Sequence, residues 1–184
     1  MSKKEVKVSL KDIWPQERDW ISRPERYKYL RRLVKPDSCV FCEANANEIG
    51  FESLCVYKTD LSMVVLNKYP YNSGHVLVLP RRHCGDLVEL SEEEYLDVSI
   101  LLRKTLKILK SSYEAQGYNL GMNHGKVAGA GIPNHLHWHI VPRWGGDTNF
   151  FPLIGETKLL PETLEQTYER LRPLFSALGE SGET

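Results

Sequence analysis

Three histidines alternate with large apolar residues near the C-terminal third of the chain, and this pattern constrains the fold more than any other. The segment reads His135, Leu136, His137, Trp138, His139 and Ile140. Successive side chains of a β-strand point to opposite faces, so a strand puts three imidazoles on one face and three apolar side chains on the other. On a helix the same histidines would lie about 200° apart. The pattern predicts a strand that carries a metal site, a nucleophile with its proton partner, or both.

The middle histidine, His137, is the expected nucleophile, because a neighbour on either side can orient it and supply or receive a proton. A histidine nucleophile suits phosphoryl or nucleotidyl transfer, since its phosphoramidate is labile enough to be discharged. A glycine-rich segment, residues 125–133, directly precedes the histidines. Gly129 and Gly131 lack a Cβ, so their backbone amides can approach an anion closely. We expect these amides to bind phosphate oxygens while His137 attacks the phosphorus.

A second pattern, Cys39 and Cys42, has the Cys-x-x-Cys spacing that supplies two of the four ligands of a zinc site. The chain has one such pair, so histidines would have to complete the site. A thioredoxin-like redox motif is the alternative, although no β-α-β pattern surrounds the pair. Cys55 and Cys84 bring the cysteines to four, but nothing in the sequence suggests an exported, disulfide-bonded protein.

Composition narrows the class of partner. The chain has 24 Lys and Arg against 24 Asp and Glu in 184 residues, so its formal net charge is zero. This balance argues against bulk binding of nucleic acid or of an anionic membrane. No apolar run approaches the ~20 residues that span a bilayer, and the charged segment 1–11 has no signal-peptide core. We expect a soluble, cytoplasmic protein.

Hydrophobic periodicity predicts an α+β fold with a mostly antiparallel sheet, one long helix and a C-terminal helix. Ser91 and Glu94 form a capping-box pattern that starts the long helix, which continues to Ser112. The other expected elements are strands at 55–59, 63–67, 75–80 and 119–123 and a helix at 161–178. We divide the chain into an N-terminal extension that packs on the domain, a catalytic domain, and a C-terminal extension with a helix, at residues 1–38, 39–150 and 151–184.

Other polar residues allow more than one role. Asn67 ends a predicted strand, where it could reach a ribose hydroxyl or simply form a turn. Arg143 and Trp144 follow the histidines, where the guanidinium could meet phosphate and the indole could stack on a base. Both could equally be packing residues. His75 begins an aliphatic strand, and we predict a structural role for it.

The segment from His135 to Arg143 resembles the signature of the histidine triad family of nucleotide hydrolases and transferases. Two upstream strings, residues 67–75 and 79–83, are similar to segments of the same family. The resemblance runs from about residue 39 to residue 144. The segment after the histidines, 142–161, resembles a narrower branch that contains diadenosine tetraphosphate phosphorylases and related dinucleoside polyphosphate enzymes.

This resemblance implies a histidine-triad fold and specific catalytic roles. His137 would attack the α-phosphorus and form a covalent nucleotidyl-histidine, and His139 would bond the phosphate or the leaving oxygen. Asn123 would contact phosphate and Asn67 the ribose. Inorganic phosphate, which gives ADP and ATP, or water would then discharge the intermediate. Hydrolysis of dinucleoside polyphosphates, hydrolysis of nucleoside phosphoramidates, and nucleotide binding by a regulatory protein with little turnover are the alternatives.

The resemblance also implies a structural zinc held by Cys39, Cys42, His83 and His135, because four protein ligands leave no open position for activated water. Cys84, beside His83, leaves open which of the two faces the metal. Family members commonly join sheets as homodimers, so a homodimer is expected. Many relatives carry a glutamine that touches phosphate before the triad, whereas residues 129–134 here contain none. Phosphate contacts would then fall to backbone amides and Asn123, which puts hydrolase-like substrate preferences in doubt.

Overall fold

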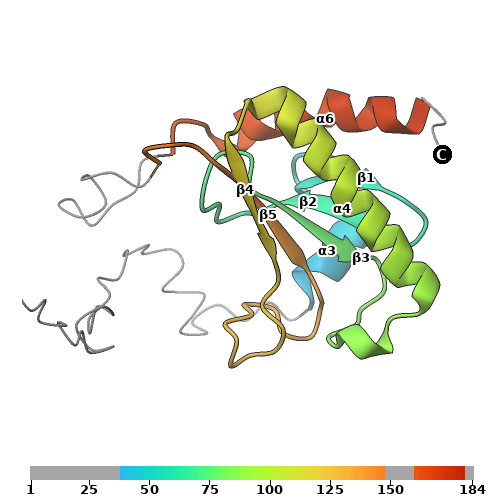
Figure 1. Ribbon diagram of the computed structural model, residues 1–184. Helices are drawn as coiled ribbons and strands as arrows, with labels where there is room; N and C mark the ends of the chain where they lie inside the picture. Colours follow the sequence, from blue (N-terminus) through green and yellow to red (C-terminus); the bar gives the residue numbers. More distant parts are fainter. Residues whose placement is uncertain (1–37, 148–159, 181–184) are drawn as a thin grey trace, which may run out of the picture.

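A computed structural model describes residues 38–147 and 160–180, which form a five-stranded antiparallel sheet with helices on both faces (Figure 1). The strand order across the sheet is β1-β2-β3-β5-β4. The strands are β1 (Cys55–Lys58), β2 (Ser62–Leu66), β3 (Val76–Pro80), β4 (Gly117–Gly121) and β5 (Trp138–Arg143). The helices are α3 (Val40–Ala46), the short 3₁₀ turn η1 (Leu87–Glu89), α4 (Glu92–Tyr113) and α6 (Leu164–Glu180). This arrangement confirms the predicted α+β fold.

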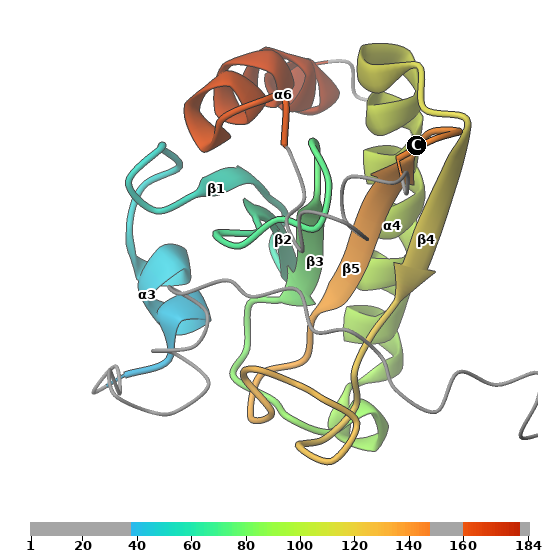
Figure 2. The same cartoon turned by 90° about the vertical axis from the view of Figure 1, so that its left-hand side faces the viewer.

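Two hydrophobic clusters sandwich the middle of the sheet. Every residue of β2 and β3 is buried, because both of their faces are covered. Val64 and Val78 point into the larger cluster, with α4 and α6, whereas Met63 and Leu77 point into a smaller cluster with Phe41 of α3. This alternation follows from the two-residue period of a strand. Figure 2 shows α3 and α4 on opposite sides of the sheet.

The long helix α4 begins and ends close to the predicted positions. The Ser91 hydroxyl accepts a hydrogen bond from the Glu94 amide (3.1 Å), and the Glu94 carboxylate accepts one from the Ser91 amide (2.9 Å). This reciprocal pair satisfies two amides that the first turn leaves without a helical partner. The helix runs to Tyr113, and Glu114 follows in the left-handed conformation (φ 47°). The capping-box prediction is confirmed.

The C-terminal helix also belongs to the main core. It lies at 164–180 where the sequence predicts 161–178, and it packs on α4 and β1. Leu171 and Phe175 are fully buried in the larger cluster. The predicted extension at 1–38 lies outside the described residues apart from Ser38, so the predicted domain boundaries stay predictions. None of the helices in the described part of the chain has the length and apolar character needed to cross a membrane.

The histidine strand is shorter than predicted, since β5 begins at Trp138 and contains only the last of the three histidines. Continuing its pairing with β3 would set Leu136 opposite Pro80, which has no N–H to donate. The Leu136 amide donates instead to the carbonyl of Cys84 (2.7 Å). His135 and His137 therefore lie in the segment that leads into β5, although Leu136 is still buried as the alternation requires.

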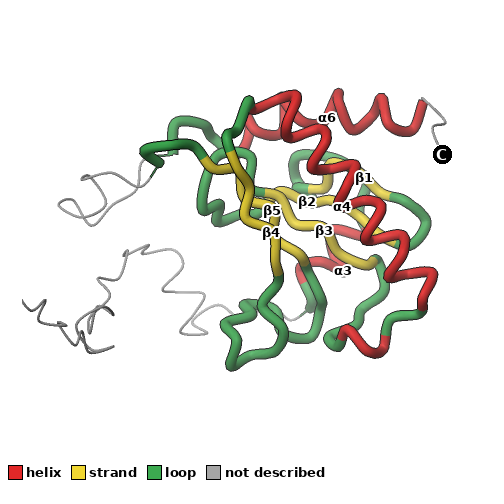
Figure 3. The backbone as a smooth tube through the Cα atoms, viewed as in Figure 1, coloured by secondary structure: helices red, strands yellow, loops and turns green. Residues whose placement is uncertain are grey.

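Two further elements differ from the prediction. The strand expected at 119–123 lies at 117–121, where Gly117 pairs with Arg143 and Gly121 with His139. The short helix α3 was not predicted; it starts directly after Cys39. Figure 3 shows the loops that follow β3 and β4 at one end of the sheet, and a hydrogen bond from the Leu87 amide to His124 Nε2 (3.3 Å) joins them.

Candidate active site

Four sulfur and nitrogen ligand atoms converge at the end of the sheet near α3. They belong to Cys39, Cys42, His83 and His135, and all lie within 4.8 Å of one another. Cys39 is the N-cap of α3 and Cys42 lies in its first turn, so the two thiols, three residues apart, share a face of the helix start. His83 comes from the loop after β3, and His135 from the segment before β5. The predicted ligand set is thus brought together as a cluster that could hold a metal ion.

Hydrogen bonds set the ring orientation of His135 in this cluster. Its Nε2 lies 2.9 Å from the carbonyl of Pro80, so this nitrogen carries the proton, and Nδ1 lies 3.4 Å from Cys39 Sγ and 3.7 Å from Cys42 Sγ. A histidine that ligates metal commonly donates its second nitrogen to a carbonyl in this way. Burial lowers the pKa of His135, and the bond to Pro80 opposes that shift. The neutral ring with a free Nδ1 lone pair is the form that binds a metal.

The structure also separates His83 from its neighbour Cys84. His83 Nδ1 lies 3.3 Å from Cys42 Sγ, inside the cluster. Cys84 is buried and its thiol donates to the carbonyl of Asp86 (3.1 Å). His83 therefore faces the candidate metal site and Cys84 does not.

His137 is oriented by its own segment. It is 7% exposed, and its Nδ1 donates to the carbonyl of His135 at 2.8 Å. With the proton held on Nδ1, Nε2 keeps its lone pair. Burial lowers the pKa of His137, while the hydrogen bond to the His135 carbonyl opposes the shift. The ring of Phe41 packs beside it at 5.1 Å between centroids. This tautomer and protonation state are those of a nucleophile.

A hydrogen-bonded chain sets the tautomer of His139. The Tyr71 amide donates to His75 Nδ1 (3.0 Å), so His75 carries its proton on Nε2. That nitrogen lies 2.9 Å from His139 Nδ1 and donates to it. A neutral His139 therefore holds its own proton on Nε2, where it can be given to a bound group. The rings of His139 and His137 meet edge to face at 5.2 Å.

The sequence predicts a structural role for His75 and none for Tyr71, and the structure brings both rings next to His139. His75 is 1% exposed, and its ring lies 4.8 Å from that of Tyr71 and 5.2 Å from that of His139. A signal was present, because a lone imidazole at the start of an otherwise aliphatic strand is a buried polar group that needs partners. The sequence does not say that the partner is His139.

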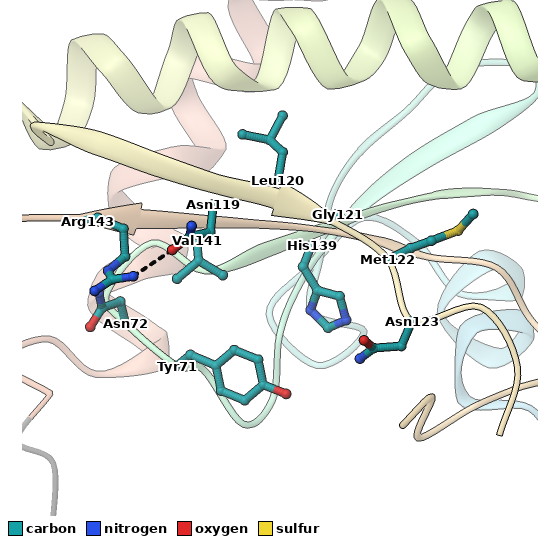
Figure 4. A pocket seen from close by; sticks show the side chains of 10 residues that line it. All are labelled: Tyr71, Asn72, Asn119, Leu120, Gly121, Met122, Asn123, His139, Val141 and Arg143. Carbon is teal, nitrogen blue, oxygen red and sulfur yellow. Dashed lines mark hydrogen bonds between the residues drawn. The ribbon is translucent and has the colours of Figure 1, made fainter. Parts of the chain in front are cut away.

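A pocket of about 440 Å³ opens beside His139 over β4 and β5 (Figure 4). Its lining consists of Tyr71, Asn72, Asn119, Leu120, Gly121, Met122, Asn123, His139, Val141 and Arg143. In Figure 4, His139 and Asn123 lie together at one end and Arg143 with Asn72 at the other. The predicted phosphate ligand Asn123 is thus next to the histidine pair.

Asn67 and the glycine-rich loop, which were also predicted to bind the substrate, make other contacts in this structure. Asn67 lies against the His75 ring, with Nδ2 3.2 Å from Nε2, while its Oδ1 accepts from the Tyr69 amide (3.0 Å). In the glycine loop, the Gly129 amide donates to the carbonyl of Lys126 (3.1 Å), so the loop closes on itself. Gly129 and Gly131 are both exposed and neither lines the pocket described above.

Arg143 and Trp144 have protein partners in this structure. The Arg143 guanidinium binds the carboxylate of Asp147 through Nε (2.5 Å) and Nη2 (2.8 Å), and donates from Nη1 to Asn119 Oδ1 (2.6 Å). This pairing holds the pKa of Asp147 well below its usual range. The Trp144 ring packs edge-on against Tyr113, at 6.2 Å between centroids, and lies outside the pocket.

Comparison with known proteins places this geometry in a family. The model of the HIT domain matches residues 50–146, more than half of the chain. The chain therefore belongs to the HIT, or histidine triad, family. Among solved structures, a zinc-bound histidine triad family protein from Mycobacterium smegmatis superposes with a TM-score of 0.61 and 26% identity, over 78% of this chain and 97% of that one.

Two curated relatives are named for their activities. "AP-4-A phosphorylase" from Mycobacterium tuberculosis is 40% identical over 116 residues, 63% of this chain and 60% of the relative. "Bis(5'-nucleosyl)-tetraphosphatase [asymmetrical]" from Schizosaccharomyces pombe is 33% identical over 119 residues, 65% of this chain and 62% of the relative. The chain thus matches about three fifths of the length of each.

Proposed function

We propose that this protein cleaves dinucleoside polyphosphates of the diadenosine tetraphosphate type, by nucleotidyl transfer through His137 with inorganic phosphate as acceptor. The observation that carries the proposal is the hydrogen bond from His137 Nδ1 to the His135 carbonyl (2.8 Å), which leaves Nε2 as the nucleophilic atom. The substrate class is supported by the similarity to the relative named AP-4-A phosphorylase. The resemblance of residues 142–161 to the same branch adds to this support.

In the first step, His137 Nε2 forms a bond to the α-phosphorus while the bond from that phosphorus to the bridging oxygen breaks. The leaving ATP takes the proton from His139 Nε2, and the Nδ1–H of His137 stays on the His135 carbonyl, which stabilises the cationic ring. In the second step, a phosphate oxygen attacks the phosphorus and the nitrogen–phosphorus bond breaks. This step releases ADP, returns a proton to His139 and restores His137.

Substrate contacts follow from the same arrangement. Asn123, beside His139 in the pocket, would bond the α-phosphate. Asn67, whose amide lies against the His75 ring, would bond the ribose. The Gly129 and Gly131 amides would need the loop to open before they could bind phosphate, since the Gly129 N–H is engaged within the loop. Arg143, at the end of the pocket away from His139, and Trp144, which follows it, would contact the substrate away from the reacting phosphorus.

We propose that the cluster of Cys39, Cys42, His83 and His135 holds a structural zinc ion. In a tetrahedral zinc site, sulfur and nitrogen ligands lie about 3.5 Å apart. The sulfur–nitrogen separations of 3.3, 3.4 and 3.7 Å in the cluster fit this value. Four protein ligands fill the coordination shell, so the ion would tie α3 and the His83 loop to the segment that carries the nucleophile, without activating water.

A homodimer that joins the sheets at β4 would use one of the two edge strands of the sheet that the described residues form. β4 is at one end of the strand order, and its Leu120 is 50% exposed. On neighbouring α4, Leu96 and Ile100 are also exposed, at 59% and 38%. An edge strand with an exposed apolar side chain invites pairing with a second copy. We place this dimer in the cytoplasm, as the sequence predicts.

A product assay with diadenosine tetraphosphate, with and without labelled phosphate, tests the function. We expect ATP and ADP only when phosphate is present, with the label in the β-position of ADP. AMP and ATP in water alone would instead assign a hydrolase, as for the relative named a tetraphosphatase. Tight nucleotide binding without any product, also from adenosine phosphoramidate, would assign a regulatory nucleotide-binding protein.

A further inference from the structure

The pocket extends well beyond the catalytic histidines, and the chemistry described above uses only one of its ends. His139 and Asn123 form that end, over the start of β5. From there the lining follows β4 and β5 past Val141 to Arg143. The volume of about 440 Å³ lies within the roughly 300–1,000 Å³ of pockets that enclose a small ligand. The pocket as a whole is therefore of a size that encloses a small ligand.

The position of the pocket beside His139 indicates which half of the substrate it can bind. In an in-line displacement the leaving oxygen lies opposite the attacking atom. The proton that this oxygen takes is on His139 Nε2, so the leaving group begins at His139. The pocket runs from His139 along β4 and β5, and Asn67, the proposed ribose contact, is not among its lining residues. The far end of the pocket is thus left for the leaving half of the substrate.

The charges at the far end favour a nucleoside over phosphate groups. Among the described residues that line the pocket, Arg143 is the one Lys or Arg, and the Asp147 carboxylate binds it through two nitrogens. Around it are the amides of Asn72 and Asn119 and the apolar side chain of Val141. A polyphosphate chain recruits unpaired cations, whereas a base and ribose need apolar surface with a few hydrogen-bonding groups.

The aromatic ring of Tyr71 also suits the base of a nucleoside. The Tyr71 ring lies nearly parallel to that of His139, with an interplanar angle of 17° and 6.0 Å between centroids, and it lines the pocket. Planar bases stack on aromatic side chains of this kind. Figure 4 shows the Tyr71 side chain facing the same space as Asn123 and His139.

We propose that this pocket binds the second nucleoside, the one on the leaving half of the dinucleoside polyphosphate. The inference rests on the function proposed above and extends it, since it assigns the selection of dinucleoside over mononucleoside substrates to Tyr71, Asn119, Val141 and Arg143. Binding energy from a part of the substrate that does not react can be used to lower the barrier at the reacting phosphorus. The wild-type protein should therefore turn over substrates with a second nucleoside faster.

The test compares diadenosine tetraphosphate with adenosine tetraphosphate, which forms the same nucleotidyl-histidine but has triphosphate as its leaving group. The blocking variant is Val141→Phe, which adds bulk on the pocket face of β5. Asn119→Ala removes an exposed amide from the pocket and keeps the test valid if the larger side chain disturbs the fold. The matched control, Val88→Phe, makes the same change at a residue of η1 that is 86% exposed.

We expect Val141→Phe to lower kcat/KM for diadenosine tetraphosphate by about tenfold or more, and Asn119→Ala by about fivefold, with less than a twofold change for adenosine tetraphosphate. Val88→Phe should change neither value. Equal losses on both substrates would overturn the assignment, because the pocket would then serve the phosphates or the fold. Unchanged kinetics with diadenosine tetraphosphate in both pocket variants would overturn it as well.

Binding measurements separate this inference from the function on which it rests. In a His137→Gln background, which cannot form the covalent intermediate, calorimetry should give weaker binding of diadenosine tetraphosphate when Val141→Phe is added, and unchanged binding of adenosine tetraphosphate. If the wild-type protein turned over neither compound, the proposed function would fail while this selective binding would still support the second-nucleoside site. If the wild-type protein bound the two compounds equally tightly, the pocket would not be a site for the second nucleoside.

Discussion

His135 and His137 lie two residues apart and are both buried, yet they present opposite ring nitrogens for chemistry. In His135, Nε2 is held by the Pro80 carbonyl at 2.9 Å, and Nδ1 faces the thiol of Cys39 at 3.4 Å. In His137, Nδ1 is held by the His135 carbonyl at 2.8 Å, and Nε2 is left with the lone pair. In each ring, a backbone carbonyl selects the nitrogen that remains available.

The role of each of these histidines depends on which segment supplies the carbonyl that accepts its proton. The carbonyl that orients His135 belongs to β3, so the candidate metal ligand depends on a contact between distant segments. The carbonyl that orients His137 belongs to the same segment, so the candidate nucleophile is oriented locally. Because different carbonyls orient the two rings, substitutions should affect the candidate metal ligand and the candidate nucleophile separately.

The sharpest separation is expected from exchanging each histidine for glutamine. His137→Gln removes the nucleophilic atom and should lower turnover of diadenosine tetraphosphate by on the order of 10⁴-fold, while the bound metal is unchanged. His135→Gln should release the metal. Steady-state kinetics and metal analysis of both purified variants check this. Turnover by His137→Gln within about tenfold of the wild type would contradict the covalent mechanism.

Removing the metal should affect mainly the fold. Stripping the proposed zinc with a chelator, or replacing one ligand by Cys42→Ser, should lower Tm by about 10 °C, since a tightly bound ion stabilises only the folded state. Thermal unfolding with and without added zinc gives the measurement. Cys55→Ser, which alters a buried cysteine outside the cluster, is the control and should retain its metal. A wild-type protein without metal, and with a Tm that zinc does not change, would exclude the site.

A smaller effect is expected at His75, which acts on the reaction through His139. His75→Phe removes the donor to His139 Nδ1 and should lower kcat by about 10²-fold, with metal content unchanged. His75→Gln, whose amide can still accept from the Tyr71 amide and donate to His139, should recover part of the loss. Equal kcat values for the wild type and both variants would show that His75 serves packing alone.

The smallest effect concerns the loop that carries His83. Arg82, next to it, donates from Nε (2.6 Å) and Nη2 (2.8 Å) to Glu94 of α4, and this bond lowers the pKa of that carboxyl to about 2. A carboxyl whose pKa is lowered by folding stabilises the fold above its unfolded pKa of about 4.3, and that stabilisation is lost as the pH falls toward 2.

We therefore expect Arg82→Met to lower Tm by about 2 °C at pH 7, because the arginine is largely exposed and its ion pair is weak. The difference from the wild type should shrink as the pH falls below 4. Thermal scans from pH 7 to pH 2 measure it, with turnover of the metal-loaded variant as the comparison. A Tm difference that does not change with pH would point to lost packing of the arginine side chain instead of the ion pair.

Local patterns predicted much of this molecule. The capping box of Ser91 and Glu94 located the start of α4, because its hydrogen bonds involve residues three apart. The resemblance named the four candidate metal ligands, which the structure brings within 4.8 Å of one another. The start of β5 was predicted too early, because its limit depends on Pro80 of another strand, and nothing in residues 135–143 indicates that partner.

The sequence by itself determined which side chains share a face and which kinds of chemistry they can perform. The two-residue alternation buried Leu136 and Ile140, and it brought His137 next to the carbonyl that orients it. Only the tertiary structure decided that His75 meets His139, that His83 rather than Cys84 joins the cysteines, and that a pocket extends past Val141. Periodicity is a property of neighbouring residues, whereas these contacts depend on how β3, β4 and β5 are paired across the sheet.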